Sequence, residues 1–115
     1  MTVIDGVVYA TPTDDKEKLR DFCEKMNALF SEYGAVQVVD AWGIEVPDGE
    51  VTSFPMAVKA KPDETVCFGW VTWPSAEARA KGWEKLMQDE RMSNAAMPFD
   101  GKRMIFGTFE AISGL

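Results

Sequence analysis

The sequence predicts one α+β domain, in which two helices lie against one face of a four-stranded antiparallel sheet. Segments rich in β-branched and aromatic residues are interrupted by two segments whose apolar residues recur at helical spacing. Clusters of Pro, Gly, Asp and Ser separate these segments. The 115 residues suffice for one domain but not for two ordinary ones, so we expect residues 1–115 to form a single domain.

The first half of the chain predicts a strand, a helix and a second strand. Residues 3–10 are mainly β-branched and aromatic, as strands are. Asp14 is the expected N-cap of the helix, and Glu17 completes a pattern like a capping box. The apolar stripe of this helix comprises Leu19, Phe22, Cys23, Met26, Leu29, Phe30 and Tyr33. Gly34 is a suitable residue to end the helix, and residues 35–43 form the second strand.

The second half predicts two further strands and a second helix. Residues 51–61 are ambiguous, and within them residues 56–61 fit either a helical turn or a short strand, whereas residues 65–73 are clearly strand-like. Ser75 caps the second helix, which ends near residues 89–91, and residues 92–96 fit a further turn of helix. The expected apolar face consists of Ala76, Ala80, Trp83, Leu86 and Met87. With a last strand over residues 103–112, the order becomes β-α-β-β-α-β, the ferredoxin-like arrangement.

Composition argues against several classes of function. The formal net charge is −7, from 12 basic and 19 acidic residues, which opposes nucleic-acid binding because phosphate neutralisation needs clustered Lys and Arg. The chain has no histidine, so it lacks the usual general base near neutral pH, the commonest haem ligand and most zinc sites. No calcium-loop spacing is present either. We therefore expect no metal and no cofactor.

The chain also lacks features of export or membrane insertion. No apolar run approaches the ~20 residues of a membrane span, and the first residues do not resemble a signal peptide. Without such a signal, Cys23 and Cys67 are expected to be reduced, buried thiols rather than a disulfide. A cytoplasmic protein without membrane contact is the resulting expectation.

Both faces of the predicted sheet are apolar, although two helices can cover only one. In the third strand, Val66, Phe68 and Trp70 point to one side, while Cys67 and Val71 point to the other. A face in contact with water should alternate to polar residues, and an exposed apolar face promotes aggregation. We therefore predict a homodimer in which two sheets pack face to face as an α/β barrel. The alternative is a lone domain whose second face is partly covered by residues 46–62 and the C-terminal residues.

Several longer strings of sequence are distinctive: Trp42-Gly43, Val46-Pro-Asp-Gly49, Thr52-Ser-Phe-Pro55, Ala57-Val-Lys59, Trp73-Pro-Ser75, Arg91-Met92 and Met97-Pro-Phe-Asp-Gly-Lys-Arg-Met-Ile105. Together they resemble the YbaA-like family of small bacterial proteins of unknown function, in the dimeric α/β-barrel superfamily. The resemblance implies the dimeric fold and supplies no activity. It includes two departures: Gly107-Thr108-Phe109 stands where Gly-Gly-Phe is expected, and the stretch between Arg91 and Met97 is shortened. The wider superfamily includes cofactor-independent monooxygenases, isomerases and haem enzymes, which is analogy at the level of fold.

The candidate ligand-binding residues are Asp40, Trp42, Arg79 and Arg103. Asp40 and Trp42 share one face of the second strand, where a carboxylate is costly unless it is hydrogen-bonded or paired. Asp40 could be a general base or orient a ligand, or it could pair with Arg79 or Arg103 or sit at an exposed strand end. Arg103 could anchor an anionic ligand or form a surface ion pair.

Two function classes remain open. The first is a protein that binds a small, partly apolar molecule between sheet and helices. The second is a cofactor-independent monooxygenase or isomerase, whose acid–base work would fall to carboxylates such as Asp5, Asp40 or Glu110 if they face one cavity. The four tryptophans could line a pocket, or belong to the core and the dimer interface. A purely structural dimer without a ligand is a third possibility.

Overall fold

The computed structural model describes residues 1–114 and contains the predicted element order with three short helical elements added. The sheet strands are β1 (Val3–Pro12), β2 (Gln37–Trp42), β3 (Glu64–Trp73) and β4 (Ile105–Glu110). The long helices are α1 (Lys16–Glu32) and α3 (Ala76–Gln88), and the short ones are α2 (Phe54–Val58) and α4 (Glu90–Ser93). A 3-10 turn, η1 (Thr13–Asp15), joins β1 to α1.

The four strands form one antiparallel sheet in the order β2-β3-β1-β4, which confirms the ferredoxin-like fold class. In β1, Gly6 lies opposite Trp70 of β3 and Gly107 of β4, so β1 is a central strand. In β2, Asp40 lies opposite Gly69. Because β2 has only one neighbour, one of its edges is free within the described residues.

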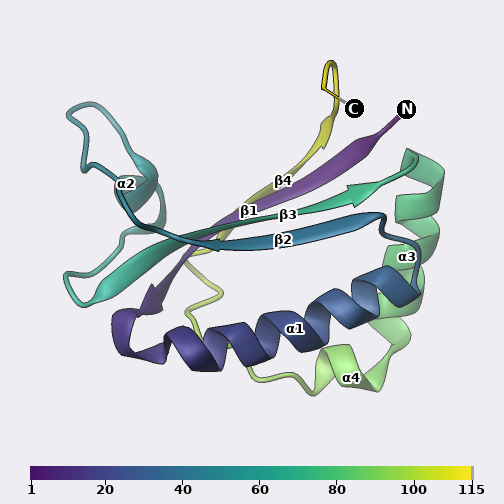
Figure 1. The fold of residues 1–115 in the computed structure, drawn as a ribbon, viewed down its shortest axis with the longest axis horizontal. Helices are drawn as coiled ribbons and strands as arrows, with labels where there is room; N and C mark the ends of the chain where they lie inside the picture. The colour runs from purple at the N-terminus through teal and green to yellow at the C-terminus, as the bar shows by residue number, and fades with distance from the viewer. Residues whose placement is uncertain (115) are drawn as a thin grey trace.

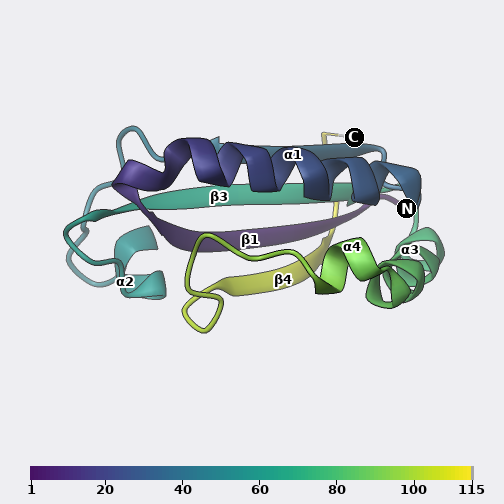
Figure 2. The same ribbon diagram turned by 90° about the horizontal axis from the view of Figure 1, so that it is seen from below.

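The helices α1, α3 and α4 all lie on the same side of the sheet (Figure 1). Turned by 90°, the molecule shows α1 in front of β2 and β3, and the segment that follows α4 in front of β1 and β4 (Figure 2). The predicted stripe of α1 is confirmed, since Leu19, Cys23, Met26 and Leu29 are buried. Trp73 and Leu86 are fully buried at the centre of the largest core cluster.

The predicted apolar face of α3 is partly wrong. Ala76, Ala80 and Met87 are exposed, whereas Gly82 and Leu86 are buried. Gly82 allows close contact with the sheet: a Cβ there would lie 2.5 Å from Cζ3 of Trp73. The helix therefore turns a glycine towards the largest fully buried side chain, a contact that the pattern of apolar residues does not indicate.

The structure corrects one further local prediction and resolves two others. Asp14 does not cap α1, because it lies within η1, and the actual N-cap residue, Asp15, forms no side-chain capping hydrogen bond. The ambiguous stretch contains the helix α2, whose N-terminus is capped by Oγ of Ser53, which accepts from the Met56 amide. The short turn of helix after α3 is α4, which starts earlier than residue 92 and is capped by Asp89.

The second face of the sheet is only partly covered. Val58 of α2 packs against Val8, Ala10 and Val66 at one end of this face. The remainder, which we call the open face, is a shallow apolar depression of about 540 Å³. Its residues are Ile4, Gly6, Val8, Phe68, Trp70, Ile105, Gly107 and Phe109. The alternation predicted for β3 is confirmed, and part of the coverage considered for residues 46–62 exists.

Candidate functional site

A pocket of about 270 Å³ lies between the sheet and the helices, and we call it the inner pocket. Its walls are almost entirely apolar and come from β1, β2, β3, α1, α3 and α4, and from the segment before β4. The segment before β4 contributes Met97, Phe99 and Met104. Phe99 packs over the Tyr9 ring, with the two ring centroids 4.3 Å apart. Methionine side chains are flexible and polarisable, so such walls adapt to ligands of different shape.

Asp5 provides one of the few polar groups of the inner pocket, and its carboxylate accepts four hydrogen bonds. The indole Nε1 atoms of Trp73 and Trp83 each donate to Oδ2 over 2.9 Å. The Nε of Arg79 and the hydroxyl of Thr108 each donate to Oδ1 over 2.8 Å. Burial raises the pKa of Asp5, but these hydrogen bonds together outweigh it and hold the pKa below its ordinary value. Asp5 is therefore an ionised structural centre rather than a free general base.

Asp40 lies at the neck of the inner pocket. Together with Cys23 and Asn27, it lines both the inner pocket and a groove of about 240 Å³ outside it, between α1 and β2, which we call the outer groove. The Asp40 side chain extends over Gly69, where a Cβ would lie 3.0 Å from its Oδ1. Asp40 is exposed to solvent, because β2 is an edge strand. This exposure removes much of the cost expected for a carboxylate on an apolar face.

Two neutral groups face the neck beside Asp40. The hydroxyl of Tyr9 lies 3.9 Å from Sγ of Cys23. Burial, together with the thiol, the Asp40 carboxylate and Cys67, raises the pKa of Tyr9. Burial and the Asp40 carboxylate also raise the pKa of Cys23, to about 12. Both groups stay protonated near neutral pH, so Cys23 has little of the thiolate character that a nucleophile needs.

The remaining predicted residues lie in different places. Trp42 lines the outer groove, where Nζ of Lys16 sits 5.7 Å from the centre of its ring. Arg79 is bound to Asp5, and its guanidinium carbon lies 5.9 Å from the centre of the Trp83 ring. The structure therefore brings Asp40 and Trp42 to the outer groove, whereas Arg79 is held by Asp5 and does not itself line the inner pocket.

Arg103 is not part of the inner pocket. Its guanidinium forms a bidentate salt bridge with Glu64, with N···O distances of 2.8 Å and 2.7 Å. Its Nε pairs with Asp100 over 3.0 Å. It also donates to the Lys59 carbonyl at the end of α2. The suggested pairing of Asp40 with Arg79 or Arg103 is wrong, because both arginines bind other carboxylates. Arg103 instead fastens α2 and the start of β3 to the turn before β4.

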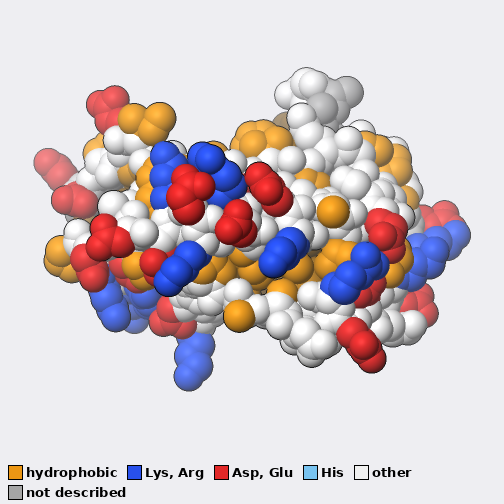
Figure 3. Space-filling view, turned by 60° about the horizontal axis from the view of Figure 1, so that its bottom comes forward, with side chains coloured by type: hydrophobic (Ala, Val, Ile, Leu, Met, Phe, Trp, Pro, Cys, Tyr) orange, Lys and Arg blue, Asp and Glu red, His pale blue; other side chains and the backbone are white. Residues whose placement is uncertain are grey.

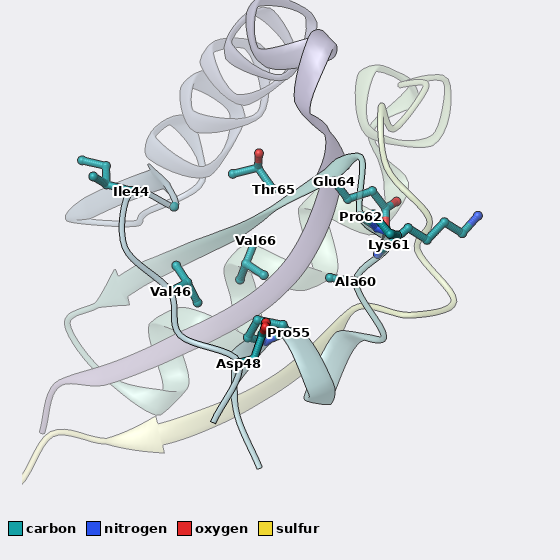
Figure 4. Close-up of a pocket in the computed structure, with 11 residues that line it drawn as sticks. Ile44, Val46, Asp48, Pro55, Ala60, Lys61, Pro62, Glu64, Thr65 and Val66 are labelled. Atoms are coloured by element: carbon teal, nitrogen blue, oxygen red, sulfur yellow. Dashed lines mark hydrogen bonds between the residues drawn. The ribbon is translucent and has the colours of Figure 1, made fainter. Parts of the chain in front are cut away.

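A second depression, of about 520 Å³, lies at the α2 end of the molecule (Figure 4). The chain between β2 and α2 forms one wall and the segment between α2 and β3 the other. Val46 and Val66 point into it, whereas the Lys61 side chain extends away (Figure 4). Glu64 is already paired with Arg103, so the depression has less to offer a ligand than the inner pocket.

The helix side of the surface carries charges of both signs. Lys and Arg side chains alternate with Asp and Glu, with hydrophobic side chains visible between them (Figure 3). No group of three or more His, Cys, Asp or Glu residues that could hold a metal is found within residues 1–114. Among these residues, no helix is both long and apolar enough to cross a membrane.

Comparison with known sequences decides the family. Residues 2–101 match the family described as Protein of unknown function (DUF1428). The chain is also 48% identical over 114 residues to YbaA of Escherichia coli K12, an uncharacterized protein, covering 97% of each chain. The YbaA protein of Shigella flexneri shows the same identity and coverage. The chain belongs to the DUF1428 family. The resemblance drawn from the sequence strings is thereby confirmed.

Solved structures share the fold of this DUF1428 protein at low sequence identity. SnoaB, a cofactor-independent oxygenase from Streptomyces nogalater, solved as a variant, aligns with a TM-score of 0.53 and 13% identity over 99% of this chain and 96% of its own. Rv0793 from Mycobacterium tuberculosis aligns with a TM-score of 0.55 and 11% identity over 99% and 98% of the two chains. At such identity these likenesses establish the fold and leave the function to be argued from the site.

The candidate site differs from the predicted one chiefly in Asp5. Sequence reasoning named this residue only as a member of a hypothetical catalytic pair. The signal that could have identified its role is the combination of a strand carboxylate with tryptophans in β3 and α3, because buried indole N–H groups need acceptors. Glu110 lies in β4 two residues beyond Thr108 and does not line the inner pocket.

Proposed function

We propose that this DUF1428 protein binds a small, partly apolar molecule in the inner pocket. The observation that carries the proposal is a largely apolar pocket between sheet and helices with an exposed carboxylate, Asp40, at its neck. Small-molecule sites have this character, with apolar walls and a few placed polar groups. The volume of about 270 Å³ is slightly below the range of roughly 300–1,000 Å³ found for drug-sized ligands, which indicates a smaller ligand.

Native mass spectrometry of protein purified without added ligand tests this function. We expect a mass above that of the polypeptide, lost when the same sample is denatured. A matched variant, Gly69→Val, places branched carbons beneath Asp40 and should reduce the retained mass without altering the sheet order. The proposal would be contradicted if the native protein and the Gly69→Val variant were both recovered without added mass and a fragment screen by NMR found no binding.

A second candidate function is cofactor-independent oxygenation or isomerisation. The fold shared with the oxygenase SnoaB favours it, as does a carboxylate at the neck that is available to accept a proton from a bound molecule. Asp5 is unsuited to that role because four donors occupy it. With the recovered molecule as substrate, Asp40→Asn should abolish turnover and preserve the fold. Arg103→Ala should lower stability alone, since its guanidinium holds Glu64 and α2.

We also propose that two copies of the chain pack with their open faces together. Phe68 and Phe109, 40% and 61% exposed, lie on this face, and each fully buried side chain of this kind contributes about 1.5–3 kcal/mol. The α2 segment rises above the sheet at one end and the chain after β4 rises at the other (Figure 1). The second sheet would pack against the apolar depression of the open face. Light scattering at micromolar concentration should give twice the mass of one chain for the native protein and the mass of one chain for Phe68→Glu. A monomer in both samples would refute the assembly.

A cytoplasmic location is part of the same proposal. It is supported by Cys23 and Cys67, which are both buried and unpaired, as in proteins of reducing compartments. Cell fractionation checks it, and recovery in the membrane or the culture medium would contradict it.

A further inference from the structure

We infer that the molecule bound in the inner pocket has an apolar body of about two fused rings and a neutral or cationic hydrogen-bond donor that reaches Asp40, and that it enters through the outer groove. This inference rests on the proposed binding function and adds the chemical class of the ligand, its orientation and its route. Three features of the structure support it: the volume of the pocket, its charged groups and the residues shared with the groove.

The volume sets the size of the apolar body. An apolar cavity of about 150 Å³ holds one benzene ring, so about 270 Å³ has room for a second ring. Aromatic rings also line the pocket from several directions, including Phe22, Phe30 and Trp83. Rings that meet edge-on or offset pack favourably, and the centroids of Phe30 and Trp83 are 5.4 Å apart in an edge-on arrangement. A flat ligand extends this packing.

The charges set the nature of the polar group. The described residues that line the inner pocket include the carboxylates Asp5 and Asp40 but no Lys or Arg. The donors around Asp5 are committed to it, so they do not offset a negative charge on a ligand. Lys16 and Arg20 line the outer groove, but Lys16 lies over Trp42 and Arg20 pairs with Glu17. An anionic head beside Asp40 would thus be repelled, whereas a hydroxyl or a protonated amine can donate to a carboxylate, which only accepts.

The shared residues set the orientation and the route. Cys23, Asn27 and Asp40 line both the inner pocket and the outer groove, so the pocket meets the groove at these three side chains. Asp40 is exposed, whereas Cys23 is buried. A ligand that enters between α1 and β2 therefore places its apolar body inside first and leaves its donor at the neck. Asn27 offers a second polar partner there.

The test is an NMR titration of the full-length protein with four probes of one skeleton: naphthalene, 2-naphthalenemethanol, 2-naphthylmethylamine and 2-naphthoate. We expect the alcohol and the amine to bind more tightly than naphthalene, and the carboxylate to bind most weakly. Amide shifts should cluster at Cys23, Asn27 and Asp40 as well as within the pocket. Asp40→Asn should weaken amine binding by about 10- to 100-fold, as expected for loss of a hydrogen bond to a charged group. It should leave naphthalene unchanged.

A matched control is Asp48→Asn, which removes the same charge from the depression at the α2 end and should not alter the order of the probes. Binding of naphthalene with no preference among the heads, or an Asp40→Asn variant that retains the preference, would overturn the inference while leaving the binding function in place. Tightest binding of the carboxylate would likewise overturn it. Failure of all four probes to bind would overturn the inference, and native mass spectrometry of the purified protein then decides whether the binding function falls with it.

Discussion

Replacing Asp5 by Asn should be the most damaging conservative change in this protein. An amide has one oxygen, so it can accept from only one of the two pairs of donors that now share the carboxylate. Its NH₂ group then faces the other pair. Trp73 is fully buried, so its indole N–H cannot turn to water, and each buried polar group left unpaired costs about 1–3 kcal/mol. Removal of the acceptor also leaves Arg79 without its ion-pair partner. We expect a loss of about 3 kcal/mol in the free energy of unfolding.

Urea unfolding monitored by tryptophan fluorescence measures this loss. The midpoint should fall while the slope of free energy against urea stays the same, because the surface exposed on unfolding is unchanged. For a domain of this size the melting temperature should drop by roughly 10–15 °C. Asp40→Asn is the matched control, since it makes the same substitution on the same side of the sheet at an exposed position. A loss below about 1 kcal/mol for Asp5→Asn, or an equal loss for the control, would refute this account of the carboxylate.

Three further outcomes follow from the same structure. Because the pKa of Asp5 is lowered in the folded protein, its contribution to the free energy of unfolding should be complete above the unfolded pKa of about 3.9 and disappear as pH falls through the folded pKa. Plots of the free energy of unfolding against pH for the native protein and Asp5→Asn should therefore converge in acid. Parallel plots would contradict this. Buried Cys23, with a pKa raised to about 12, should react with iodoacetamide at pH 8 at least about tenfold more slowly than in denaturant, as mass spectrometry would show; equal rates would disprove it. Gly82→Ala should destabilise by about 3 kcal/mol because its Cβ would overlap Trp73. Gly6→Ala, whose Cβ would meet only ordinary contacts at 3.7 Å, is the comparison, and similar urea midpoints for the two variants would exclude the packing argument.

The fold was predictable because its signals are local. The stripe of α1 and the alternation of β3 arise from residues a few positions apart, and periodicity detects them. The inward face of α3 was not predictable from apolar residues, because Gly82 contributes by the absence of a side chain. The N-cap of α1 was also wrong, since η1 shifts the start of the helix.

The candidate site depended on contacts between distant segments, which the sequence does not order. Asp40 and Trp42 were recognised because they share a strand face, and the structure places both on the outer groove. The partners of Arg79 and Arg103 were not recognised, because Asp5 is 74 residues and Glu64 is 39 residues away in the chain. The registers of β1 against β3 and β4, and of β2 against β3, determine which of the carboxylates face each other.

The hydrogen bonds of Asp5 also constrain the order in which a ribosome can complete this fold. Asp5 is synthesised before all of its donors, which lie on β3, α3 and β4, the last of them at Thr108. The central strand β1 therefore remains unpaired until its neighbours, first β3 and then β4, have been synthesised. Pairings between such distant segments form slowly, so the apolar β1 is available to chaperones for much of synthesis.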